Sequence, residues 1–75
     1  MEKERLQKYA DTILKGYLPL NEHYARFEIE NNIHKRKIEQ VHSLIMSVPM
    51  RMDDAIKVEI ADNAVRKLKD AYGMN

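Results

Sequence analysis

The positions of two prolines and two glycines constrain the fold of this 75-residue chain most strongly, because these residues interrupt regular secondary structure. Pro19 and Pro49 divide the chain into three stretches, and Gly16 and Gly73 lie near the ends of the first and the last stretch. Between Asn21 and Ser47 there is neither proline nor glycine. A chain with so few interruptions has room for long helices.

The chain is short and contains no cysteine. A domain of this size buries only about 60% of the surface that its unfolded chain exposes, and it has neither disulfides nor a thiolate zinc site to stabilise it. We therefore expect one small helical domain over residues 1–75, stabilised by helix packing or by another chain. A core this small leaves no room for a deep catalytic cleft, so we predict a protein that is not an enzyme and binds no cofactor.

The first stretch has apolar residues at the spacing of an amphipathic helix. They are Leu6, Tyr9, Ala10, Ile13, Leu14 and Tyr17. Gly16 occupies the place of a C-terminal cap, and Pro19 cannot continue a helix. The pattern predicts a helix over residues 2–15.

The second stretch carries apolar residues at alternating steps of four and three, and we call this line the seam. The seam consists of Leu20, Tyr24, Phe27, Asn31, His34, Ile38, Val41, Ile45 and Val48, and the polar Asn31 and His34 interrupt it in the middle. Asn21 can cap a helix that continues for some 26 residues, with Asn31 as a buried residue that sets its register. Alternatively, Asn31 and Asn32 break the helix, which we favour because adjacent asparagines are typical of caps and turns.

The third stretch predicts a helix over residues 53–72. Asp53 and Asp54 suit its start, and Lys67 and Lys69 suit its end near Gly73. With residues 47–52 as a loop, the predicted fold is all-α, either a three-helix bundle or a helical hairpin with a third helix.

An α+β fold is the alternative. Apolar and charged residues also alternate with the period of a strand in residues 24–30 and 56–60, so these two segments could pair as a short ribbon. No hairpin turn signal joins them, and an isolated two-stranded ribbon is only marginally stable.

Apolar residues of the seam and the following loop are the candidate contact surface for a partner. They are Ile38, Val41, Ile45, Met50 and Met52. Methionine side chains adapt to irregular apolar partners, although those of the loop could equally fill the end of a small core. We expect a small regulator or protein–protein interaction module that forms a homo-oligomer or binds another protein whose identity the sequence does not indicate.

A nucleic-acid-binding regulator is the second hypothesis. Its candidate residues are Asn32, Lys35, Arg36, Lys37 and Gln40. The basic side chains could contact phosphates, while Asn32, Arg36 and Gln40 recur on one helix face and could read bases. A net charge of only +1 and a pI of about 8.0 argue against strong binding.

Metal and membrane binding have no support in the sequence. His23, His34 and His42 are too widely separated to form a helical chelate pair, so we predict no metal site. The longest apolar run, residues 44–46, is far shorter than a membrane span. The charged opening residues 2–5 have no apolar segment after them, which favours a cytoplasmic location.

Overall fold

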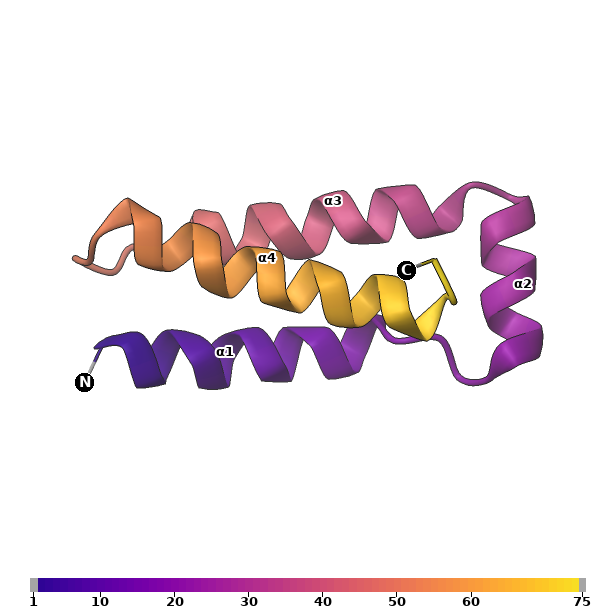
Figure 1. Cartoon of the computed structure of the whole chain (residues 1–75), viewed down its shortest axis with the longest axis horizontal. Helices are drawn as coiled ribbons and strands as arrows, with labels where there is room; N and C mark the ends of the chain where they lie inside the picture. The colour runs from indigo at the N-terminus through magenta and orange to yellow at the C-terminus, as the bar shows by residue number, and fades with distance from the viewer. Residues whose placement is uncertain (1, 75) are drawn as a thin grey trace.

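The computed structural model describes residues 2–74 and shows an elongated helical bundle with one helix across its end (Figure 1). The described residues form α1 (Glu2–Tyr17), α2 (Glu22–Glu30), α3 (Ile33–Met46) and α4 (Asp54–Ala71). α1, α3 and α4 lie along the long axis, and α2 crosses the end at which α1 finishes and α3 begins.

The predicted all-α class is confirmed, and residues 2–74 contain no strand. The α+β alternative is wrong because residues 24–30 and 56–60 both lie in helices. The helical period brings Ala25 of the first segment and Ile60 of the second into the core, which gives each helix a buried side.

α1 is longer than its sequence predicts. Leu6, Ala10 and Leu14 are buried, as the apolar spacing indicates, but the helix continues through Gly16 to Tyr17. The prediction that Gly16 caps this helix is therefore wrong. The residue before a proline is disfavoured in helical conformation, so Pro19 is sufficient to end the helix.

The two asparagines at residues 31 and 32 break the second stretch, as we favoured. Asn21 caps α2, with its side-chain oxygen accepting a hydrogen bond from the Tyr24 N–H at 3.1 Å. Asn31 ends α2, and Asn32 has a φ of 59°, which takes the chain out of the helix before α3 starts. The described residues thus form four helices where three were predicted.

α4 follows its predicted bounds closely. The Asp53 side chain accepts a hydrogen bond from the Ala55 N–H at 3.0 Å and caps the start. At the other end Gly73 has a φ of 71°, and the N–H groups of Gly73 and Met74 donate to the carbonyls of Asp70 and Lys69, both at 3.0 Å. This is a Schellman motif, and it requires the left-handed conformation that glycine adopts readily.

The core lies mainly between α1, α3 and α4. Its buried apolar residues are Leu6, Ala10, Leu14, Ala25, Val41, Ile45, Ile60, Ala61, Ala64, Leu68 and Tyr72. Met50 and Met52 of the α3–α4 loop are partly buried against it, and the Lys57 Nζ donates to the Val48 carbonyl at 3.2 Å. The loop therefore covers the end of the core opposite α2.

Candidate interaction surface

α2 turns its largest apolar side chains away from the bundle. Leu20, just before the helix, is 82% exposed, and Tyr24 and Phe27 are 48% and 52% exposed. These three residues form what we call the α2 outer face. Tyr24 and Phe27 are three positions apart in α2 and share one side of the helix, whereas Leu20 precedes the Asn21 cap and lies before the first helical turn. Two further exposed apolar residues, Leu18 and Ile33, lie at its two ends in the sequence.

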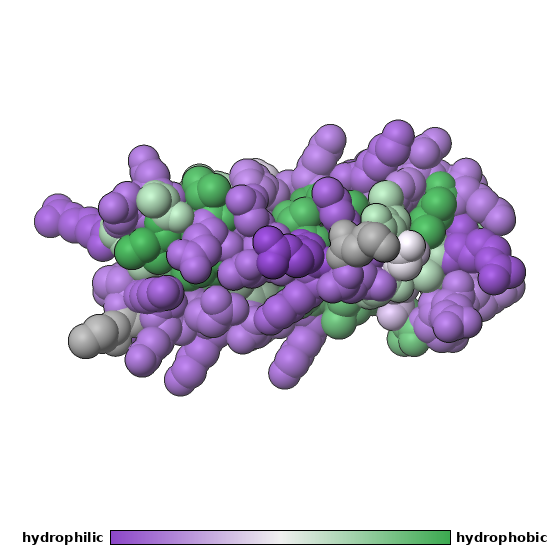
Figure 2. Space-filling view, in the orientation of Figure 1, coloured by the Kyte–Doolittle hydropathy of each residue, from purple (hydrophilic) through white to green (hydrophobic). Residues whose placement is uncertain are grey.

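The space-filling view places this surface in context. Figure 2 shows hydrophilic side chains over most of one face of the molecule, with apolar residues gathered at the α3–α4 end and beside α2. Single exposed apolar residues are common in small proteins, but two exposed aromatic residues on one short helix, with an exposed leucine just before it, are typical of a contact surface.

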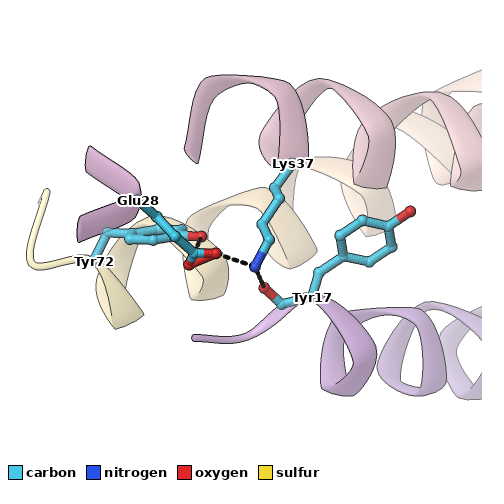
Figure 3. Close-up of polar contacts among 4 residues, drawn as sticks. All are labelled: Tyr17, Glu28, Lys37 and Tyr72. Carbon is cyan, nitrogen blue, oxygen red and sulfur yellow. Dashed lines mark hydrogen bonds and ion pairs between the residues drawn. The ribbon is translucent and has the colours of Figure 1, made fainter. Parts of the chain in front are cut away.

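The inward side of α2 carries a glutamate. Glu28 is only 7% exposed, and it forms what we call the buried cluster with Lys37 of α3 and Tyr72 at the end of α4 (Figure 3). Its carboxylate forms an ion pair with the Lys37 ammonium and accepts a hydrogen bond from the Tyr72 hydroxyl at 3.1 Å. The Lys37 Nζ also donates to the Tyr17 carbonyl at 3.3 Å. The cluster joins all the helices of residues 2–74 where α2 meets the bundle.

The environment of Tyr72 changes its acidity. Burial raises the pKa of its hydroxyl well above the ordinary value, and the hydrogen bond to Glu28 and the negative charge of that carboxylate raise it further. The phenol therefore stays protonated and remains a hydrogen-bond donor. The His34 ring packs edge-on against Tyr72 with centroids 5.9 Å apart, and His34 is only 4% exposed.

A groove of about 540 Å³ separates α2 from the end of α4. Ala25, Ile29 and Ala71 contribute apolar surface to it, and Glu22 and Glu30 contribute acidic groups. It opens to solvent. The groove also shows that α2 is not packed closely against α4 along this side.

The predicted partner-binding residues differ in how far they are buried in the structure. Val41 and Ile45 are 0% exposed in the chain's own core, so they offer no surface to a partner. Ile38, Met50 and Met52 are partly buried against the same core. The large apolar seam residues that reach solvent are Tyr24 and Phe27 of α2 and Leu20 just before it. The contact surface predicted from the sequence did not include these residues. The asparagine pair was the available signal, because a break there separates the two halves of the seam.

The predicted nucleic-acid-binding residues are also divided. Asn32, Lys35, Arg36 and Gln40 are exposed on α3. Lys37 is not available to a phosphate, because it points inward to Glu28 and the Tyr17 carbonyl.

Other sites and relatives give no further guidance. Among residues 2–74 no group of histidine and acidic side chains is arranged to hold a metal ion. No described helix has the length and apolar character needed to cross a bilayer. Comparison with protein-family models, curated proteins and solved structures finds no match to this chain.

Proposed function

We propose that this chain is a non-catalytic protein–protein interaction module that associates with a second copy of itself through the α2 outer face. The observation that carries the proposal is the orientation of α2, which buries Glu28 and exposes Leu20, Tyr24 and Phe27. A helix that serves only its own fold would be more stable with the opposite orientation.

The spacing and residue types support this function. Side chains at positions i and i+3, such as Tyr24 and Phe27, are usual anchors of a helix that binds an apolar surface. Tyrosine is enriched in the energetically dominant parts of interfaces, and apolar aromatic rings bring large areas with few rotatable bonds.

Charge supports a second copy as the partner. On the flank of the outer face that borders the groove, Arg26 lies at the middle of α2 and Glu30 lies at its end, and both are exposed. When two copies of α2 pack antiparallel across a two-fold axis, the same flank of each helix meets its equivalent, so Arg26 of one copy approaches Glu30 of the other. This arrangement pairs opposite charges twice at the rim of an apolar contact.

Sedimentation velocity across a concentration series tests the proposal. We expect the chain to move from monomer to dimer as concentration rises, and we expect Leu20→Ser with Phe27→Ser to remove the dimer. Tyr9→Ser is the matched control, because Tyr9 is a comparably exposed aromatic residue on α1. A wild-type chain that stays monomeric at millimolar concentration, or a dimer that survives the double substitution, contradicts the proposal.

The nucleic-acid hypothesis remains a prediction with a reduced set of residues, since Lys37 belongs to the buried cluster. Lys35→Glu with Arg36→Glu is now the informative variant. If nucleic acid were the partner, this change would abolish retention on DNA or RNA, and binding would weaken steeply with salt. A cytoplasmic location also remains a prediction, and cell fractionation tests it.

A further inference from the structure

In the sequence the seam runs without a gap from α2 into α3. In the structure the junction between the two helices interrupts it. The half in α3 includes His34, Val41 and Ile45, all of which are buried, whereas the half in α2 is exposed. If α2 and α3 were one straight helix, both halves would lie along one side, because the steps of four and three are unbroken, with the polar Asn31 and His34 between the apolar residues of the two halves.

The junction itself is short. Its turn depends on Asn32, the one described non-glycine residue with a positive φ, and its side chain makes no capping hydrogen bond to α3. Asparagine tolerates the left-handed conformation, but it also adopts the helical one. Moving this residue into the helical region is the main backbone change needed to join the two helices.

α2 is held to the bundle by a limited apolar contact. Ala25 is its only buried apolar residue in the described chain, and Ile29 is partly buried. Its remaining attachment is the buried cluster, whose charged groups regain hydration when they separate in water. The outer face gains apolar contact only when a partner covers it.

We propose, on the basis of the function proposed above, that two copies exchange α1 when α2 and α3 straighten at Asn31–Asn32. In this dimer each α1 packs on the α3 and α4 of the other copy, and the two α2 segments cross antiparallel with their outer faces in contact. Exchange of an identical element is a known route to dimers, and short hinge loops favour it.

The chain connections allow this exchange. From Glu22 to Ile33 a straight helix advances about 17 Å. With two such segments antiparallel and fully overlapped, the start of each α2 lies beside the start of the partner's α3. In the closed chain α1 ends at that same end of the bundle (Figure 1), so the short connection before Asn21 can deliver α1 into the partner. The overlap centres on Phe27 and brings Leu20 near the partner copy's Ile33.

Cross-linking between differently labelled copies tests the exchange, since the described chain has no cysteine of its own. Asp11 on α1 and Lys67 on α4 form a surface ion pair with 4.0 Å between Oδ1 and Nζ, and both side chains are at least half exposed. Asp11→Cys and Lys67→Cys chains, refolded together and treated with a short bismaleimide, give cross-linked heterodimers only if α1 of one copy packs on α4 of the other. The Asp11→Cys chain alone is the control, because its two cysteines lie far apart in the exchanged dimer.

The hinge provides a second measurement. We expect Asn32→Ala to raise the dimer association constant about tenfold and Asn32→Gly to lower it, because alanine disfavours and glycine favours the left-handed turn. If dimers form without heterodimer cross-links, and their association constant is the same in the Asn32 variants as in the wild type, the exchange is wrong and the proposed function still stands. A chain that stays monomeric would overturn both.

Discussion

α3 and α2 follow one another along the chain but differ in which of their large side chains they bury. α3 lies alongside α4 in the bundle (Figure 1), and it directs aliphatic side chains such as Val41 and Ile45 into the core that it shares with α1 and α4. α2 crosses the end of the bundle, and it directs Glu28 inward and Phe27 outward. The same helical period therefore places apolar side chains in the core in α3 and exposes them to solvent in α2. What differs is the number of neighbouring helices available to cover each one.

Truncation of one apolar side chain in each helix should give the largest difference in the free energy of unfolding. We expect Ile45→Ala to lower the free energy of unfolding by about 3 kcal/mol, because it leaves a cavity in the core. Phe27→Ala should change it by less than about 0.5 kcal/mol at concentrations where the chain is monomeric. Urea denaturation followed by circular dichroism measures both. Equal losses would show that α2 is as fully integrated into the fold as α3.

The buried cluster should contribute the next largest effect. Lys37→Met leaves the Glu28 carboxylate without its cation, and we expect a loss of about 2 kcal/mol, below the usual cost for a fully buried pair because the Lys37 side chain is 24% exposed. Lys35→Met is the control, since Lys35 is exposed on the same helix. A Lys37→Met chain as stable as the control would mean that α2 does not depend on this ion pair.

Much of the local structure could be predicted from neighbouring residues. The cap at Asn21, the helix start near Asp53 and Asp54 and the break at Asn31–Asn32 depend on side chains within a few positions, and the structure confirms them. Gly16 was misread because the following Pro19 already determines where α1 ends.

The candidate surface could not be predicted in the same way. The path of the chain after the Asn32 turn decides which side of α2 faces the bundle, and no periodicity contains that information. The contact between Glu28 and Tyr72 joins residues 44 positions apart, and it exists only once the helices are assembled. Val41 and Ile45 were predicted as partner contacts because an apolar side looks the same in sequence whether its own chain or another covers it.

Tyr72→Phe separates the hydrogen bond of the buried cluster from its ion pair. At neutral pH we expect a loss of about 1.5 kcal/mol, because Glu28 loses a donor to its charged carboxylate. The raised pKa of the Tyr72 hydroxyl also predicts a pH dependence. Its contribution is complete below the unfolded value of about 10 and is lost as pH rises beyond that, because the unfolded phenol then releases a proton that the folded one retains. Unfolding at pH 9 to 11 should therefore show a steeper decline for the wild type than for Tyr72→Phe, and parallel curves would contradict this account.

The cap of α2 should have the smallest effect and the most local one. Asn21→Ala removes the acceptor for the Tyr24 N–H, which normally costs about 1 kcal/mol. α2 has nine residues and few covering neighbours, so we expect this cost to appear as local opening of that helix. Amide hydrogen exchange should accelerate about fivefold in α2, whereas amides near Val41 in the centre of α3 should keep their wild-type protection. If α3 accelerated equally, the two helices would open as one cooperative unit, and the difference between them would lie only in their surfaces. Confinement of the change to α2 would instead identify the segment that carries the exposed apolar face as the part of the fold that opens first.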